Sequence, residues 1–290
     1  MKRNVSARAV AHGGQVHDLG VMKQPSLFIP HGGGPCFFMD PSDGDRLHSD
    51  PMWHPMQAYL KGLMSDLPER PKAMLIVSAH WEEPSFTVHG GSQPSLLFDY
   101  SGFPPHTYAL RWDAPGEPVL AGRVVSLLSD AGFPVGQETD RGWDHGVFIP
   151  MKVALPDAGI PVVQLSLRRD LDPAAHIAAG RALAGLRDEG VLIIGSGMSF
   201  HNMRVRGPEG TDRAVEWDDA LTSAVTDPDP QRRAARVSAW DQLPEARFAH
   251  PREEHLLPLM VALGVGADDP ARLDHRSTVL GWTVSAYRFG

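Results

Sequence analysis

Residues 26–35 read SLFIPHGGGP, and this stretch decides the fold. The apolar run at residues 27–29 is short enough for a buried strand, and Pro30 ends it directly before His31 and three glycines. Glycine lets the chain turn sharply and lets other groups approach the backbone closely. A histidine at the carboxyl end of a strand lies where open α/β sheets bind ligands. The stretch therefore predicts a strand that delivers a histidine to a functional site. The alternative is a glycine-rich turn with an incidental histidine.

The rest of the chain alternates apolar runs of strand length with stretches of helical periodicity. Residues 73–79 (AMLIVSA) are almost unbroken in hydrophobicity, which is typical of a strand buried on both faces of a sheet. Residues 52–67 place Met and Leu side chains at helical spacing and are followed by two prolines. The further predicted strands are residues 86–88, 133–137, 161–166, 191–194 and 277–289, the last with a bend at Gly281. The further predicted helices are residues 117–131, 174–187, 212–226, 230–242 and 253–263, the last carrying His255.

This alternation predicts the α/β class, as a three-layer α/β/α domain around a mixed, largely parallel central sheet. No linker or internal repeat divides the chain, so we expect residues 25–290 to form one domain after a loose N-terminal tail of residues 1–24. Residues 93–118 are rich in proline, glycine and aromatic residues, and they are too long for a simple connection. Such loops are often lids or walls of binding sites.

Composition limits the kinds of partner. The 290 residues are 42% hydrophobic and 21% charged, as in soluble globular proteins. The formal net charge of -8 argues against a nucleic-acid partner. No apolar run approaches the ~20 residues that span a bilayer, and no signal-peptide pattern is visible, so we expect no membrane partner and a cytoplasmic location. The single cysteine, Cys36, excludes an internal disulfide and a cysteine-cluster metal site. A monomer and a homodimer are both open.

Five of the 14 histidines stand in comparable settings. His31, His80 and His201 each come just after an apolar strand, and strand ends on one edge of a sheet converge in space. His145 and His255 have similar contexts, flanked by Gly or Glu. Any one alone reads as a hydrogen-bonded structural histidine, but several at equivalent points favour a shared site. Imidazoles with a carboxylate and open positions are the ligands of non-haem iron(II) oxygenases and of catalytic zinc, and the sequence leaves both metals open. The candidate carboxylates are Glu82, Glu83, Glu253 and Glu254.

A nucleophilic hydrolase is the competing interpretation. Ser196 lies between two glycines but lacks the full G-x-S-x-G pattern, so we expect Ser196 and Ser199 to shape the turn before His201. Cys36 is a second candidate nucleophile, although an isolated cysteine usually behaves as a small buried hydrophobe. A zinc-dependent hydrolase using the same histidines, and a protein that only holds a metal, therefore stand beside an oxygenase.

Five motifs taken together resemble a known family. They are LFIPHGGGP (27–35), VSAHW (77–81), WDHG (143–146), GSGMSFHN (195–202) and HPREEHLLPL (250–259). Their order and separations are similar to those of the DODA-type extradiol aromatic ring-opening dioxygenases, the 4,5-DOPA dioxygenase-like branch of the class III, LigB-like superfamily. The resemblance covers roughly residues 26–290. It implies a non-haem iron(II) enzyme that inserts both atoms of dioxygen into a catechol-type ring, with zinc found in the same site of some members.

The resemblance also implies roles for single residues. His31, His80 and His255 match metal-binding positions, with Glu254 as an alternative third ligand. His201 matches the catalytic acid–base position of the superfamily or a fourth metal contact, and His145 matches a second active-site histidine. The expected substrates are a small aromatic diol and dioxygen. The candidate aromatic wall, whose alternative role is ordinary loop packing, consists of Phe103, Pro104, Pro105, Tyr108 and Trp112.

Overall fold

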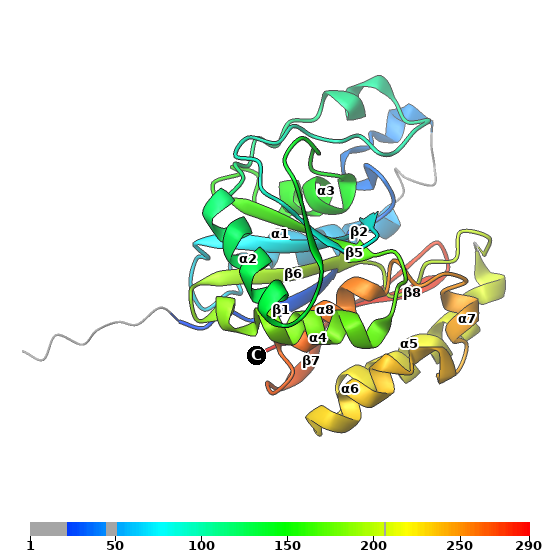
Figure 1. Cartoon of the computed structure of the whole chain (residues 1–290). Coiled ribbons are helices and arrows are strands. Elements are labelled where there is room, and N and C mark those ends of the chain that lie inside the picture. The colour runs from blue at the N-terminus through cyan, green and yellow to red at the C-terminus, as the bar shows by residue number, and fades with distance from the viewer. Residues whose placement is uncertain (1–21, 45–50, 206) are drawn as a thin grey trace, which may run out of the picture.

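The computed structural model describes residues 22–44, 51–205 and 207–290. Within these residues, one eight-stranded sheet carries helices on both faces (Figure 1). The strands are β1 (Ser26–Pro30), β2 (Ala73–Glu83), β3 (Phe86–His89), β4 (Val135–Glu138), β5 (Val162–Arg168), β6 (Val191–Gly197), β7 (Ala271–Val279) and β8 (Trp282–Phe289). The α-helices are α1 (His54–Gly62), α2 (Pro118–Asp130), α3 (His145–Ala154), α4 (Pro173–Leu183), α5 (Thr211–Val225), α6 (Pro230–Ser238), α7 (Ala246–Ala249) and α8 (Leu257–Val265).

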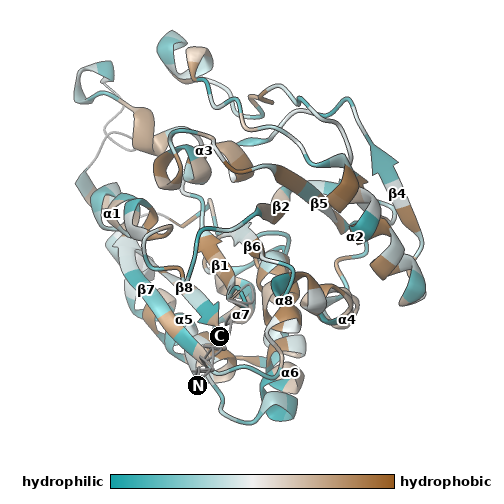
Figure 2. Ribbon diagram, turned by 90° about the vertical axis from the view of Figure 1, so that its left-hand side faces the viewer, coloured by the Kyte–Doolittle hydropathy of each residue, from teal (hydrophilic) through white to brown (hydrophobic). Residues whose placement is uncertain are grey.

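The sheet is mixed, and its centre is parallel. The strand order is β4-β3-β5-β2-β6-β1-β8-β7, and β5, β2, β6 and β1 run parallel to one another. The strand β8 joins β1 antiparallel, β7 joins β8 antiparallel, and β3 joins β5 antiparallel. The helices α1 and α3 cover one face, and α2, α4 and α8 cover the other (Figures 1 and 2). The predicted α/β class with a largely parallel central sheet is confirmed.

Hydrophobicity explains which strands lie in the centre. All residues of β1 and β6 are buried, because helices cover both faces of these strands. Hydrophilic residues are instead frequent on the edge strands β4 and β7 (Figure 2). The helix α8 is buried over its whole length and is apolar all round, as expected for a helix in the core.

The predicted helix over residues 253–263 is too long at its start. The helix α8 begins only at Leu257, with Pro258 in its first turn, where the missing N–H of proline costs no hydrogen bond. His255 therefore lies in the turn before α8 and not on the helix. Likewise, the predicted helix over residues 52–67 is regular only over α1 and continues as turns.

The predicted closing strand over residues 277–289 is in fact most of a hairpin. The chain reverses at Leu280 and Gly281, whose φ angles are 56° and 83°, and the flanking residues Val279 and Trp282 pair with each other. Two consecutive residues with positive φ match the tight turns that suit the twist of antiparallel strands. The expected bend at Gly281 is thus a complete reversal, and β7 becomes the edge of the sheet.

The helix α3 was not predicted, because its sequence lacks an amphipathic period. Nine of its residues are buried, Lys152 being the exception, and Pro150 lies inside it. His145 is its first residue. The strand β2 also extends to Glu83, so that His80 belongs to the strand, next to an irregularity of pairing between Val77 and Glu82.

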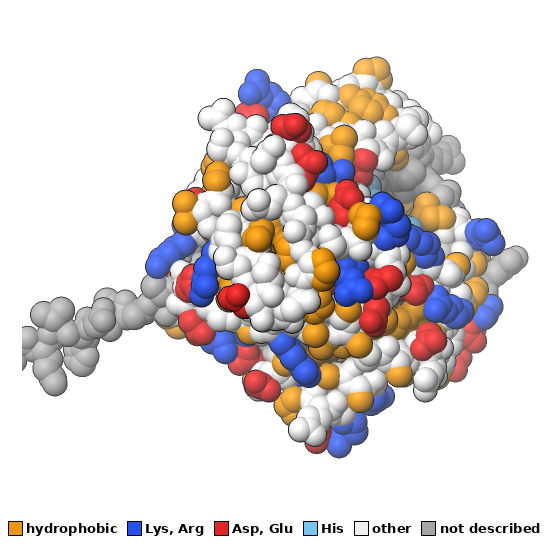
Figure 3. All heavy atoms as spheres, in the orientation of Figure 1, with side chains coloured by type: hydrophobic (Ala, Val, Ile, Leu, Met, Phe, Trp, Pro, Cys, Tyr) orange, Lys and Arg blue, Asp and Glu red, His pale blue; other side chains and the backbone are white. Residues whose placement is uncertain are grey.

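Residues 1–21 of the predicted tail lie outside the described residues. Gln24 is buried, and its backbone N–H donates to the carbonyl of Arg187. No helix within the described ranges is long and apolar enough to cross a bilayer. Among the described residues, the face drawn in Figure 3 mixes acidic and basic side chains.

Candidate active site

Three neighbouring parallel strands bring histidines to one edge of the sheet. His31 directly follows β1, His80 lies near the carboxyl end of β2, and His201 comes a few residues after β6. The pairing of β1 and β6 continues one step past β1, since the N–H of His31 donates to the carbonyl of Gly197 at 3.1 Å. Strand pairing therefore sets the positions of these histidines.

The glycines after His31 turn the chain back on itself. Gly32 has a φ of 85°, and a Cβ there would lie 2.5 Å from the sulfur of Cys36, so only glycine fits. Nδ1 of His31 donates to the carbonyl of Gly32 at 2.8 Å. Cys36 is buried, and burial raises the pKa of its thiol far above the ordinary value, which makes it a poor nucleophile.

His145 is held at the start of α3 by a residue of the long loop. Asp99 Oδ1 accepts from the backbone N–H of His145 at 2.9 Å and from its Nδ1 at 2.8 Å. The preceding Asp144 is fully buried and accepts from Ser78 and Arg141, at 2.6 and 2.9 Å. The WDHG motif thus combines a structural aspartate with a histidine that faces the site.

His255 is held against β6 by close backbone packing. Its carbonyl accepts from the N–H of Met198 at 3.0 Å, and a Cβ on Gly197 would lie 2.2 Å from the same oxygen. Glu254 lies beside it: its Oε1 accepts from Nδ1 of His255 at 2.9 Å and stands 3.6 Å from Nδ1 of His201. The rings of His201 and His255 stack with a centroid separation of 3.5 Å.

The five imidazoles share one pattern of orientation. Each Nδ1 lies within 3.7 Å of an oxygen: Gly32 carbonyl for His31, Asp99 for His80 and His145, and Glu254 for His201 and His255. An Nδ1–H that donates to oxygen leaves the lone pair on Nε2, and this arrangement is typical of metal-binding histidines.

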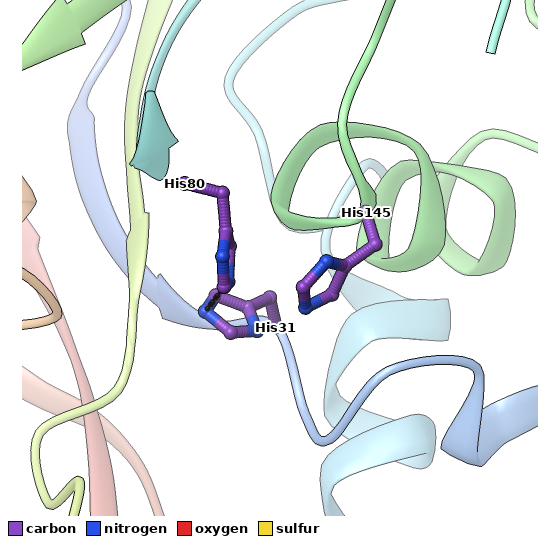
Figure 4. A group of neighbouring side chains, drawn as sticks. All are labelled: His31, His80 and His145. Carbon is purple, nitrogen blue, oxygen red and sulfur yellow. Dashed lines mark hydrogen bonds between the residues drawn. The ribbon is translucent and has the colours of Figure 1, made fainter. Parts of the chain in front are cut away.

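The Nε2 atoms of His31 and His80 lie close together inside the site. Nε2 of His31 and Nε2 of His80 are 3.3 Å apart, and Figure 4 shows these two rings and His145 pointing toward one another. Two ligands ~2.1 Å from one ion are roughly 3–3.5 Å apart at ordinary coordination angles. Nε2 of His255 is buried with no hydrogen-bond partner, and its ring centroid lies 4.8 Å from that of His80. A metal ion satisfies such converging lone pairs.

Burial keeps His31, His80 and His255 neutral near neutral pH. Desolvation lowers the pKa of His31 and of His255 well below the ordinary value, and neighbouring imidazoles lower both further. Desolvation, followed by the effect of His145, lowers the pKa of His80 to about 4. Because metal ligation requires neutral imidazole, the site is ready for an ion near neutral pH.

Two sets of three ligating groups are compact enough to hold an ion. His31, His80 and His145 form one set, and His201, Glu254 and His255 form the other, with ligand atoms within 4.8 Å of each other in each set. The other candidate carboxylates have partners outside this centre. Arg252 binds Glu82 at 2.6 Å, the indole N–H of Trp81 binds Glu83 at 3.0 Å, and Arg247 binds Glu253 at 2.7 Å.

All five histidines line one cavity of about 210 Å³. Phe103 is the one member of the predicted aromatic wall that lines it; Trp112 is buried elsewhere and donates to the carbonyl of Leu155 at 2.9 Å. No local sequence pattern marks the other apolar lining residues, which come from distant segments: Trp53, Tyr100, Met198, Met203, Leu280 and Trp282.

The serines near β6 have structural partners. The hydroxyl of Ser196 donates to the carbonyl of Gly146 at 2.5 Å, and Ser199 Oγ accepts from the N–H of Ser285 at 2.7 Å. Both side chains are fully buried. Neither serine contacts a histidine through these bonds, which leaves the hydrolase interpretation without a nucleophile at Ser196 or Ser199.

Comparison with known proteins decides the family. The family model described as the catalytic LigB subunit of aromatic ring-opening dioxygenase matches residues 26–289. The chain belongs to the LigB family of aromatic ring-opening dioxygenases. It is an extradiol ring-cleaving dioxygenase, and the resemblance seen in the five motifs is confirmed.

Relatives of this LigB-family chain match most of its length. Dioxygenase tasH of Hapsidospora irregularis is 36% identical and covers 92% of this chain and 85% of that protein. The 4,5-DOPA dioxygenase extradiol of Beta vulgaris is 39% identical over 76% of this chain and 84% of its own. The structure of an uncharacterized protein, JW3007, from Escherichia coli K12 superimposes with a TM-score of 0.72 at 29% identity, covering 92% of this chain and all of that one.

Proposed function

We propose that this dioxygenase uses iron(II) to cleave the ring of a catechol-type substrate, a small aromatic diol, with dioxygen. One observation carries the proposal: five imidazoles line one cavity, and each Nδ1 lies within 3.7 Å of an oxygen, so that Nε2 is the ring nitrogen available to a metal or a substrate. The names of several relatives, 4,5-DOPA dioxygenase extradiol, also support a catechol substrate, since DOPA carries that ring. A cytoplasmic location and the oligomeric state, monomer or homodimer, stay predictions.

We infer that His31, His80 and His255 would hold the metal. Nε2 of His31 and Nε2 of His80 lie 3.3 Å apart, and Nε2 of His255 is buried with no hydrogen-bond partner. In this assignment Glu254 is not the third ligand; it accepts a hydrogen bond from Nδ1 of His255 and orients that ring. When bound, iron(II) would supply the redox chemistry by which electrons pass from the diol to dioxygen, whereas zinc has no redox chemistry.

The two remaining histidines would then handle protons. His201 lines the cavity but is partly exposed, and its Nδ1 faces Glu254, so Nε2 can accept the proton that the diol loses on binding and return it later. His145 donates Nδ1–H to Asp99, which orients Nε2 toward the cavity to hydrogen-bond the substrate. Both roles require a ring that is fixed in position by a carboxylate.

The proposed reaction is balanced without an added reductant. One aromatic diol and one dioxygen give one ring-opened product. The ring carbon–carbon bond next to the diol breaks, and the substrate supplies the electrons that reduce dioxygen. Each of the two carbon atoms that formed this bond then carries one oxygen atom from dioxygen. Both diol protons remain available to His201 and to the product acid.

The test is anaerobic loading with iron(II), followed by a panel of catechols and measurement of oxygen uptake. We expect one dioxygen consumed for each ring opened, with the yellow colour of a ring-opened product. Turnover by the zinc-loaded protein without oxygen uptake would instead support the hydrolase. A protein that keeps metal but converts no catechol would contradict the proposal.

A further inference from the structure

Outside the histidines, the wall of the active-site cavity is mostly apolar and carries no charged side chain among the described residues. Apart from the histidines and three glycines, its described residues are aromatic or aliphatic, and none is Lys, Arg, Asp or Glu. Two polar side-chain groups of this wall already have hydrogen-bond partners. The Tyr100 hydroxyl donates to the carbonyl of Thr107 at 2.8 Å, and the Trp282 indole N–H donates to the carbonyl of Val205 at 2.5 Å.

Two nearby arginines of the described chain face other partners, and Arg204, exposed beside Met203, does not line the cavity. Arg141 donates to Asp144 and to the carbonyl of His80, at 2.9 and 3.1 Å. Arg252 binds both oxygens of Glu82. Neither guanidinium lines the cavity, so neither is placed to bind an anionic group on a substrate.

We propose that the preferred substrate is a catechol whose substituent is short and uncharged, such as an alkyl or alkenyl chain. This inference rests on the proposed catechol function and specifies its substrate class. A carboxylate or an amino-acid group placed against the buried side chains of Leu280 and Trp282 would lose water on that side without gaining a partner from the wall. A hydrocarbon chain gains from the same burial. The volume of about 210 Å³ lies below the usual range for drug-sized ligands, which suits a single ring with a short chain.

The proposed preference disfavours DOPA, the substrate that the names of several relatives indicate. DOPA carries a charged amino-acid group on its catechol ring. The described wall offers that group no ion pair, so we expect DOPA to be a poor substrate here, although its ring fits the same histidines.

The test compares three catechols of similar shape on the iron-loaded enzyme: propylcatechol, dihydroxyphenylpropanoate and the primary amide of that acid. We expect kcat/KM for propylcatechol to exceed that for the acid by about 10- to 100-fold, because the acid leaves a buried charge unpaired. The amide should fall between them. Anaerobic calorimetry of binding gives the same comparison without turnover. Equal values, or a preference for the acid, would overturn the inference.

A charge-insertion variant provides the matched control. Met203 lines the rim of the cavity and is 48% exposed, so Met203→Arg adds a cation there at little cost in burial. It should shift the ratio of acid to propylcatechol toward the acid by about tenfold or more. Val119→Arg adds the same charge at an exposed position outside the cavity and should leave the ratio unchanged.

If no catechol is cleaved but propylcatechol still binds best, the proposed reaction is wrong and the inferred preference stands. An unshifted ratio in Met203→Arg would count against the inferred wall.

Discussion

Two carboxylates orient four of the five active-site imidazoles. Asp99 contacts His145 and lies 3.7 Å from Nδ1 of His80, and Glu254 stands behind His201 and His255. Each carboxylate therefore serves one proposed metal ligand and one proposed proton-handling residue. Burial alone would raise the pKa of the Asp99 carboxyl, but the hydrogen bond from His145 and the nearby imidazoles lower it overall, which keeps it an acceptor.

Asp99→Asn tests the positioning role of this carboxylate. The amide has the same shape, but its NH₂ group must face Nδ1 of either His80 or His145, so that ring loses its orienting acceptor. We expect a loss of about 10- to 100-fold in iron(II) affinity or in kcat, the usual effect of changing a residue behind a metal ligand. Asp113→Asn, at an exposed position later in the same loop, is the control. Wild-type iron affinity and kcat in Asp99→Asn would contradict this role.

The histidines could be predicted from the sequence, whereas the residues around them could not. Strand ends and glycines mark His31, His80 and His201 because local hydrophobicity defines the strands. Asp99 is 46 residues from His145 in an aperiodic loop, so no local pattern joins the two. Trp282 and Leu280 line the cavity because the β7–β8 hairpin places them there, and the sequence indicated only a bend at this point.

At the scale of elements, the close approach between β6 and the turn before α8 positions His255. The strand β6 carries glycines where that turn crosses it, and the carbonyl of His255 occupies the space that a side chain on Gly197 would need. Glycine inside a strand is often a sign of such an approach. The sequence showed the glycine but not its neighbour, because the contact joins distant segments.

Gly197→Ala should therefore move His255. The added methyl group would lie 2.2 Å from a backbone oxygen that cannot rotate away. We expect a loss of about 1–3 kcal/mol in unfolding free energy, as for other overpacked sites, together with weaker iron binding. Urea unfolding and metal analysis measure both.

Gly122→Ala is the matched control: Gly122 lies in α2 with no atom near its missing Cβ, and alanine there should stabilise by about 0.5–1 kcal/mol. If the two variants behave alike, the close approach has no role.

At the scale of the whole molecule, a histidine outside the site links the sheet to a helix. His176 is fully buried on α4; its Nδ1 donates to the carbonyl of Asp172 at 2.7 Å, and its Nε2 accepts from the N–H of Arg168 at 3.2 Å. Desolvation lowers its pKa to about 4. A proton on Nε2 would oppose the N–H of Arg168, so the folded protein resists protonation here.

This contact predicts a loss of stability in acid. Between pH 6.5 and about 4 the unfolded chain takes up a proton that folded His176 refuses, so the unfolding free energy falls as pH falls, by roughly 3 kcal/mol over that window. His176→Gln keeps a donor and an acceptor but cannot titrate. Urea unfolding of both proteins without metal should show a shallower pH dependence in the variant, by about one proton. Parallel curves would show that His176 does not contribute.

The global fold was predictable only in part. Unbroken apolar runs identify the parallel centre, since strands buried on both faces need them. The order of strands and the antiparallel β7–β8 edge depend on packing between distant segments, which leaves no periodic pattern in the chain. The helix α3 escaped prediction for a related reason, because a helix buried on nearly all sides has no polar face.

The central claim is that His31, His80 and His255 hold the metal while His145 and His201 act on the substrate. The most direct measurement is the iron(II) bound per chain by His255→Ala, His145→Ala and His201→Gln, loaded anaerobically and checked for folding by circular dichroism. We predict that His255→Ala loses iron, and that the other two keep about one ion per chain but lose turnover, His201→Gln by about 100- to 10,000-fold. Loss of iron in His145→Ala together with full iron in His255→Ala would contradict the account.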